Sequence, residues 1–209
     1  LAMQFLATAE KQGTTAPLMI GHRLMGVSLL LTVNIAQGRG HLDEAIALYD
    51  PAAHRPLATR FSIEPGVASL CFRAKALWLL GYPEAALADA DNALKNAREI
   101  RQAGALLLAL FHVSLTHIRC GNYTAATAEA DELVAFADKK TALYWKAFGM
   151  LNQGCLLVLT GKASDAVQMI NSGIAACRST GTTTWVPFNL SFLASAYAEL
   201  GQFDDAWRC

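Results

Sequence analysis

The sequence carries no excess charge, no long apolar run and no paired cysteines. Its 17 Lys and Arg residues balance 17 Asp and Glu residues, which removes the attraction that nucleic acids and anionic membranes exert on a basic protein. The longest apolar stretch, from Ala103 to Leu115, already contains His112 and is shorter than the roughly 18 residues that a membrane-spanning helix needs. Leu1 to Lys11 form an amphipathic pattern without a basic start or a small-residue cleavage site. We therefore expect no nucleic-acid partner, no membrane association and a cytoplasmic location.

The sequence also lacks the motifs of metal centres and active sites. Its five cysteines are odd in number, and none forms a C-x-x-C pair, so we interpret them as buried, reduced thiols. His112 and His117 do not share a helix face; Cys120 could add a ligand, but a zinc site needs three or four, and a further one is missing. Neither a phosphate-binding loop nor a serine–histidine–acid arrangement occurs. We expect no metal, no cofactor and no catalytic residue in this chain.

A repeat is the strongest positive signal. Hydrophobic residues make up 54% of the chain and charged residues 16%, which excludes disorder. Within this composition, turn glycines recur at intervals of 40 residues, each with a small residue seven positions before it and an alanine five positions after it. The glycines are Gly81, Gly121, Gly161 and Gly201, the preceding residues are Ala74, Ser114, Gly154 and Ala194, and the alanines are Ala86, Ala126, Ala166 and Ala206. A weaker copy has Val33 in place of the glycine, 48 residues before Gly81.

This pattern predicts stacked helical hairpins. A glycine can end a helix with positive φ, and small residues on both sides of the turn let the paired helices approach closely. Each hairpin buries its apolar face only against its neighbours. The predicted fold is all-α, an α-α superhelix of about five hairpins. The predicted helices are 1–12, 17–32, 35–49, 66–80, 83–100, 103–120, 123–138, 142–159, 163–178 and 186–200, with a last helix cut short at Cys209. We expect residues 1–209 to form one repeat domain of a longer protein, because neither end carries the polar cap of a repeat array.

The small–Gly–Ala phase is similar to the tetratricopeptide consensus, whose usual period of roughly 34 residues is shorter than this one. The segments GHRLMGVSLLLTVNIAQGRGHLDEAIALYDP (21–51), HRPLATRF (54–61) and PGVASLCFRAKALWLLGYPEAALADADNAL (65–94) resemble the C-terminal helical region of bacterial proteins that join an adenylate/guanylate cyclase domain to an AAA-type ATPase. MalT-like regulators share the plan of an ATPase followed by helical repeats. The resemblance implies a regulatory region whose parent chain carries its chemistry elsewhere. At the first turn Val33-Asn34 departs from the expected Gly-Asp type.

The concave face is the usual binding surface of such solenoids. The tetratricopeptide phase directs an aromatic, mostly apolar set toward it, which suits a peptide, a helix or an apolar small molecule. The same aromatics could instead pack against the next helix. These positions are Arg23, Cys71, Lys75, Trp78, Phe111, Leu115, Arg119, Phe148, Leu151, Cys155, Phe188, Ser195 and Glu199.

The irregular stretch from Asp50 to Pro65 is a second candidate. His54, Arg55 and Arg60 could bind an anion or dock other parts of the parent protein. Alternatively, the stretch is an insertion that packs over the neighbouring hairpin.

The functional hypothesis is a non-catalytic interaction module that binds a protein or peptide, including domains of its own parent chain. The alternative is a sensor that takes up a small-molecule effector, as the likeness to MalT-like regulators implies. Uncapped ends also predict association between copies of the chain.

Overall fold

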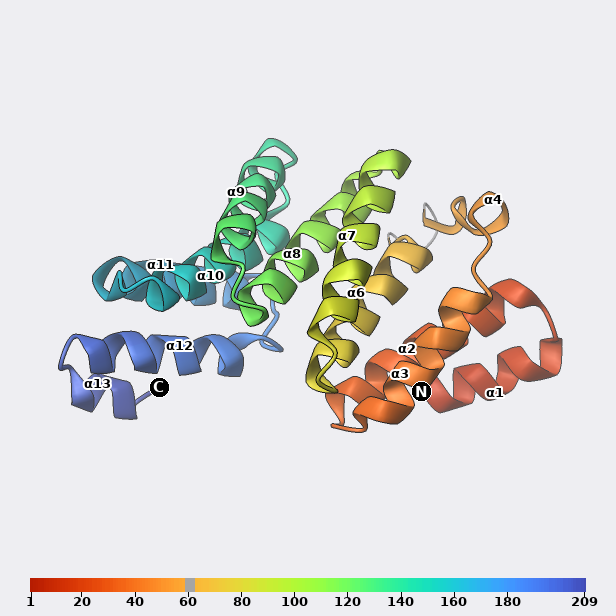
Figure 1. The fold of residues 1–209 in the computed structure, drawn as a ribbon, viewed down its shortest axis with the longest axis horizontal. Helices are drawn as coiled ribbons and strands as arrows, with labels where there is room; N and C mark the ends of the chain where they lie inside the picture. The colour runs from red at the N-terminus through yellow and green to blue at the C-terminus, as the bar shows by residue number, and fades with distance from the viewer. Residues whose placement is uncertain (59–62) are drawn as a thin grey trace. The chain divides into compact units, whose positions relative to one another are not determined.

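The computed structural model describes residues 1–58 and 63–209 (Figure 1). Helices and turns make up this part of the chain, and no strand occurs within it. The helices are α1 (Ala2–Gln12), α2 (Thr15–Leu31), α3 (Ile35–Ala47), α4 (Pro51–His54), α6 (Pro65–Leu79), α7 (Pro83–Ile100), α8 (Ala103–Arg119), α9 (Tyr123–Lys139), α10 (Leu143–Leu159), α11 (Ala163–Ser179), α12 (Val186–Glu199) and α13 (Phe203–Trp207). The all-α prediction is confirmed, and the long helices begin and end within two residues of their predicted bounds.

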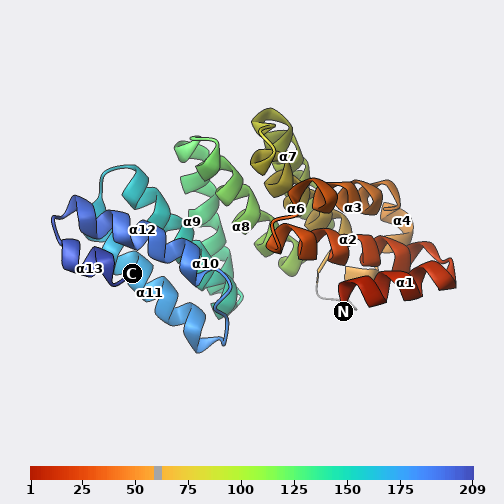
Figure 2. The ribbon, with the colours of Figure 1, turned by 90° about the horizontal axis from the view of Figure 1, so that it is seen from below.

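The helices form two compact units, residues 1–120 and 121–209. In the first unit α2 pairs with α3 and α6 with α7, as Figures 1 and 2 show. The second helix of each pair also packs on the first helix of the next, α3 on α6 and α7 on α8, while α6 contacts α8 directly. In the second unit α9 packs on α10, α10 pairs with α11, and α11 packs on α12. Whether the units act as the single domain expected from the sequence stays a prediction.

The predicted turn glycines end helices in the left-handed conformation. Their φ angles are 86° at Gly81, 77° at Gly121, 74° at Gly161 and 72° at Gly201. After α6 the chain reverses, and the backbone N–H of Tyr82 donates to the carbonyl of Leu77 at 2.9 Å. This bond satisfies a carbonyl that the end of the helix leaves without a partner.

The first turn has the same conformation without a glycine. Val33 has a φ of 65°, a conformation that is costly for a β-branched residue. The N–H of Asn34 donates to the carbonyl of Leu29 at 2.9 Å, the same kind of bond as in the glycine turns. The backbone geometry of the first hairpin is therefore that of the others, although its sequence departs from them.

Small residues lie where paired helices touch. Ala74 and Ser114 are buried before their turns, and Ala86, Ala126 and Ala166 are fully buried after theirs. In the first hairpin, a methyl group added to Gly26 of α2 would lie 2.7 Å from Leu42 Cγ and 2.9 Å from the carbonyl oxygen of Gly38. Both contacts are too short for carbon, so the two helices can approach this closely only because Gly26 has no side chain.

The stretch from Asp50 to Pro65 contains structure that the sequence did not predict. Asp50 caps the short helix α4, because its Oδ1 accepts the N–H of Ala52 at 2.9 Å. Glu64 caps α6 in the same way, since Oε2 accepts the N–H of Val67 at 2.6 Å. No helix in the described parts of the chain is both long and apolar enough to cross a bilayer.

Candidate functional site

The candidate site is the α6–α8 face, which we define by Lys75 and Trp78 on α6 and His112 and Arg119 on α8. Lys75 and Trp78 follow the buried Cys71 at positions i+4 and i+7, so all three lie on one side of α6. That side meets α8, because α6 and α8 are in contact. His112 is buried, whereas Lys75, Trp78 and Arg119 are half-buried. Cations and an aromatic ring are thus gathered at the edge of a packed helix contact.

Trp78 joins the two helices. Its Nε1–H donates to the backbone carbonyl of Arg119 at 3.1 Å, one of the last carbonyls of α8, which lack a partner within the helix. The guanidinium carbon of Arg119 lies 5.6 Å from the centre of the Trp78 ring, within the range of a cation–π interaction. The indole is therefore held by its own hydrogen bond and has a cation over its face.

The basic groups of this face influence one another. Burial, and then the charge of Arg119, lower the pKa of Lys75. Burial, followed by Arg119 and Lys75, lowers the pKa of His112 to about 3. The ring of His112 lies edge-on to Phe72 and Phe111, with ring centres 4.8 and 4.9 Å apart. At neutral pH His112 is thus an uncharged core residue, and Lys75 and Arg119 supply the positive charge of the face.

The other residues predicted for the groove differ in exposure. Six are buried in the helix packing, with at most 4% of their surface exposed, and have almost no area for a partner in this conformation. They are Cys71, Phe111, Leu115, Phe148, Leu151 and Cys155. In the structure, these six side chains pack against the neighbouring helices. On α12, Ser195 and Glu199 are exposed and Phe188 is half-buried, its ring centre 5.2 Å from that of Phe192.

Arg23 of α2 belongs to a separate polar cluster that the sequence analysis missed. Within the described residues its Nε is buried without a hydrogen-bond partner. Burial lowers the pKa of Arg23, and the nearby charge of Glu64 opposes that effect. Glu64 is fully buried and accepts the Tyr49 hydroxyl at 2.6 Å as well as the cap bond of α6. The signal in the sequence was a glutamate directly before Pro65, the position of a helix cap.

The two described loop candidates, His54 and Arg55, have different partners. His54 is buried, and its Nδ1 accepts the backbone N–H of Asp50 at 2.9 Å. Arg55 is exposed and lies 3.9 Å from the carboxylate of Glu99. Arg60 lies outside the described residues. The imidazole of His54 therefore forms a hydrogen bond within the loop itself.

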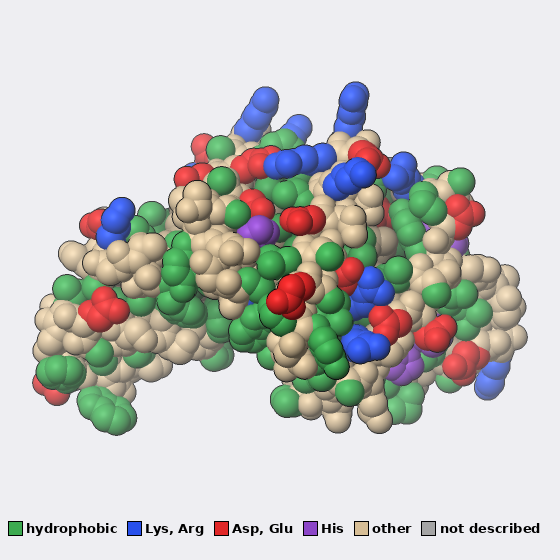
Figure 3. Space-filling view, in the orientation of Figure 1, with side chains coloured by type: hydrophobic (Ala, Val, Ile, Leu, Met, Phe, Trp, Pro, Cys, Tyr) green, Lys and Arg blue, Asp and Glu red, His purple; other side chains and the backbone are tan. Residues whose placement is uncertain are grey.

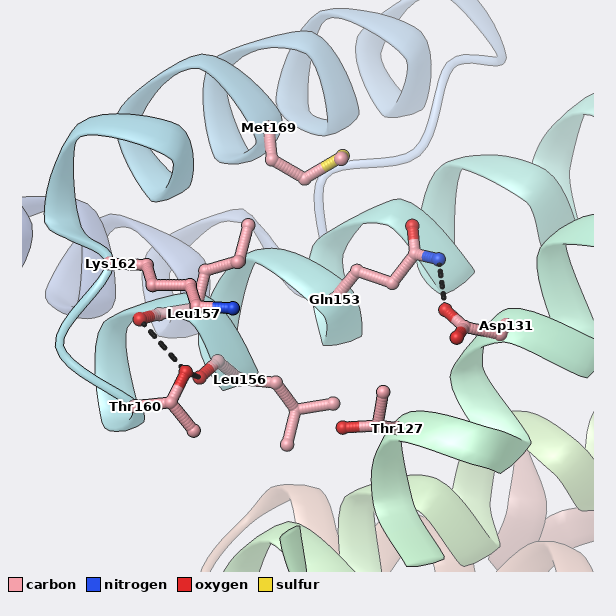
Figure 4. Close-up of a pocket in the computed structure, with 8 residues that line it drawn as sticks. All are labelled: Thr127, Asp131, Gln153, Leu156, Leu157, Thr160, Lys162 and Met169. Carbon is pink, nitrogen blue, oxygen red and sulfur yellow. Dashed lines mark hydrogen bonds between the residues drawn. The ribbon is translucent and has the colours of Figure 1, made fainter. Parts of the chain in front are cut away.

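The second unit contains a pocket that was not predicted (Figure 4). Its volume is about 350 Å³. Its walls come from α9, α10, α11 and the turn before α11, and are formed by Thr127, Asp131, Gln153, Leu156, Leu157, Thr160, Lys162 and Met169. The amide of Gln153 donates to Asp131 at 2.7 Å, and leucine and methionine side chains supply the apolar part. In the described parts of the chain, no three His, Cys, Asp or Glu side chains come together as metal ligands.

The two units differ in the surface that they show in Figure 3. Acidic and basic side chains are interspersed over the helices of the first unit and over α9 of the second, whereas the region of α11, α12 and α13 shows mainly hydrophobic and uncharged polar side chains. Some of the charged side chains of the first unit form ion pairs. The guanidinium of Arg73 donates two hydrogen bonds to Asp89, at 2.7 and 2.8 Å, and one to Asp43 at 3.1 Å.

Comparisons with known proteins support the repeat. A tetratricopeptide repeat model matches residues 67–88, which cover most of α6, the turn after it and the beginning of α7. No protein of curated function matches the sequence. The crystal structure of the apo form of RapI is similar over 99% of this chain and 94% of its own, with a TM-score of 0.62 and 9% identity. A Rap protein complexed with Competence and Sporulation Factor matches over 97% of this chain and 76% of its own, with a TM-score of 0.51 and 14% identity. At these identities the likeness establishes the tetratricopeptide-like fold.

Proposed function

We propose that this chain is a non-catalytic, polypeptide-binding repeat module and that the α6–α8 face is its binding surface. The observation that carries the proposal is Trp78, a half-buried aromatic fixed by its bond to the carbonyl of Arg119. An aromatic ring that is already ordered loses little entropy on binding, and for this reason tryptophan dominates many protein interfaces. Arg119 beside it adds a second side chain of the type that is enriched at interfaces.

The fold supports this function. Helical-repeat proteins present extended surfaces built from the first helices of successive hairpins, and α6 and α8 are such helices. A Rap protein with a similar fold has been solved as a complex with Competence and Sporulation Factor. The resemblance of segments 21–51, 54–61 and 65–94 to cyclase- and ATPase-linked proteins extends the proposal. In this view the module regulates a bacterial signalling protein whose catalytic domains lie elsewhere in the parent chain.

The test starts from a random peptide library displayed on phage and selected on the immobilised chain. Enriched peptides are synthesised, and their affinity for the wild type, Trp78→Ala and Tyr82→Ala is measured by fluorescence anisotropy. Tyr82 is the matched control, because it is an exposed aromatic in the turn after α6. We expect Trp78→Ala to weaken binding at least about tenfold and Tyr82→Ala to leave it unchanged. If no selected peptide depends on Trp78, the α6–α8 face is not the binding surface.

A small-molecule sensor is the second candidate, and the pocket of about 350 Å³ in the second unit favours it. Pockets of roughly this size hold small ligands, and here Asp131 and Lys162 supply charges of both signs beside leucine and methionine side chains. Thermal-shift screening of amino acids and nucleotides tests this candidate. A ligand whose stabilising effect disappears in Gln153→Ala would support the sensor, whereas a screen without any such ligand would count against it.

Self-association is a further part of the proposal. Phe203 and Trp207 are 63% and 86% exposed, and exposed aromatics of this size favour contacts between proteins. Light scattering that shows only monomer over a wide concentration range would contradict it.

A further inference from the structure

We infer that the first unit binds a divalent transition-metal ion between α2 and α3, with the imidazoles of His22 and His41 as its protein ligands. The inference goes beyond the function proposed above, because the site lies on other helices than the α6–α8 face. It rests on the distance between the two rings, on the helix contact that holds them there and on the pocket that they line.

The two ring nitrogens are as far apart as two ligands of one metal ion. Nδ1 of His22 lies 3.1 Å from Nδ1 of His41. Zinc and similar ions bind imidazole nitrogen at about 2.0–2.1 Å, which places neighbouring ligands about 3.3 Å apart in tetrahedral and about 2.9 Å apart in octahedral geometry. The observed distance falls between these values. Without an ion, one ring donates an N–H···N hydrogen bond to the other, and small rotations of the rings would turn both nitrogens toward a shared ion.

The hairpin holds the two rings at this distance. α2 and α3 lie side by side (Figures 1 and 2) and approach closely at Gly26, where an added methyl group would lie 2.9 Å from the carbonyl oxygen of Gly38. His22 precedes Gly26 by one turn of α2, and His41 follows Gly38 by about one turn of α3. Because the helices are antiparallel, these positions lie opposite each other. Ligands fixed in this way by a packed scaffold need little rearrangement to bind.

Both histidines line an open pocket of about 450 Å³ between the two helices. They are half-buried, so an ion can reach them from solvent. Glu44 lies three positions after His41, on the same face of α3, and its carboxylate adds a negative charge to the pocket wall. The other residues that line the pocket are Met25, Leu29, Gln37 and Gly40.

The ligands select the class of ion. Imidazole suits Zn²⁺, Ni²⁺ and Cu²⁺, whereas Mg²⁺ and Ca²⁺ prefer oxygen ligands. Since no three His, Cys, Asp or Glu side chains come together as ligands in the described residues, the site is a clip of two histidines, with water as the remaining ligands. No short sequence motif indicates the pair, because the histidines are 19 positions apart. An ion bound to both helices would stabilise the hairpin whose turn contains Val33, with its φ of 65°.

The test is thermal denaturation of the chain, followed by circular dichroism, with added NiCl₂, ZnCl₂ or MgCl₂. At a nickel or zinc concentration about 100-fold above the dissociation constant, the melting temperature should rise by about 5–10 °C, and MgCl₂ should leave it unchanged. His22→Ala and His41→Ala should each remove most of this rise and weaken the affinity measured by calorimetry at least about tenfold. His117→Asn is the matched control, a half-buried histidine of α8, and should retain the rise.

Each rise is measured against the same variant without metal, so a loss of basal stability cannot imitate a loss of binding. The cysteines, which also bind these ions, are the same in every variant. A wild-type melting temperature that nickel and zinc leave unchanged, or a rise that persists when both histidines are replaced, would overturn the inference. Neither result bears on peptide binding at the α6–α8 face, so the proposed function is tested separately.

Discussion

Acidification should destabilise the first unit through one buried histidine. His112 is 5% exposed, has its ring edge-on to those of Phe72 and Phe111, and feels the positive charges of Arg119 and Lys75. Burial and these charges lower its pKa to about 3, whereas an unfolded histidine has a pKa of about 6.5. The unfolded chain therefore binds a proton at this position well before the folded chain does. The contribution of the neutral His112 to stability is fully present above the pKa of the unfolded histidine. It is lost as the pH falls toward the pKa of the folded one.

The size of the effect follows from the difference between the two pKa values. At pH 5 an unfolded histidine is almost fully protonated while His112 remains neutral in the folded protein. The free energy of unfolding should then be about 2 kcal/mol lower than at pH 7.5, at about 1.4 kcal/mol for each pH unit below 6.5. Burial also lowers the pKa values of His41 and His117, so they contribute to the total in the same direction.

The assay is urea denaturation followed by circular dichroism at a series of pH values. His112→Phe removes the titrating group and keeps an aromatic ring among aromatic neighbours. We expect the loss of stability between pH 7.5 and pH 5 to be smaller in this variant by about 2 kcal/mol. The comparison isolates His112, because the other histidines are the same in both proteins. An identical pH dependence in the two proteins would refute the assignment of the low pKa to this residue.

Four further substitutions test the packing. Val33→Gly should raise the free energy of unfolding by about 1 kcal/mol, because glycine adopts the left-handed conformation of this turn without strain; an unchanged urea midpoint would show that the valine is not strained. Gly26→Ala should lower stability by about 1–3 kcal/mol, because the new methyl group would overlap a leucine of α3. Gly40→Ala, with no atom within 4 Å of the new carbon, should raise stability by up to about 1 kcal/mol, and equal effects at the two glycines would contradict the packing described. Tyr49→Phe should cost about 1 kcal/mol by removing the donor to Glu64, and an unaltered denaturation curve would mean that the carboxylate does not need this bond.

The repeat made the helices predictable because its key positions are occupied by residues with strong local conformational or packing preferences. A glycine such as Gly81 ends a helix wherever positive φ is needed, and an alanine such as Ala86 marks a close crossing, so both can be recognised from the sequence. Even Val33 could be placed, because the spacing of its small neighbours identified the turn. The helix α4 was missed because its signal was a single capping aspartate, Asp50, within an irregular stretch.

The chemistry of the site was less predictable, because it depends on which helices meet. Phase alone assigned Phe111 and Lys75 to one groove, whereas in the structure Phe111 is buried and Lys75 is half-buried. The low pKa of His112 arises from groups on both α6 and α8. The charges of Arg23 and Glu64, which influence one another, belong to residues 41 positions apart in the sequence. Such pairings require the packed fold, since no local pattern encodes them.

The contrast between the two units shows where function can reside in a repeat of this kind. The turns and small residues follow the same plan in both, because every hairpin must solve the same packing problem. The contacts between the first helices of successive hairpins do not follow a common plan. At α6 and α8 that contact carries Trp78 and Arg119, whereas at α10 and α12 it carries the thiol of Cys155, which lies 3.5 Å from the side-chain oxygen of the buried Asn189. Positions that packing leaves open to variation are the ones that can be specialised for a partner, and at α6 and α8 they carry an indole with a guanidinium over its face.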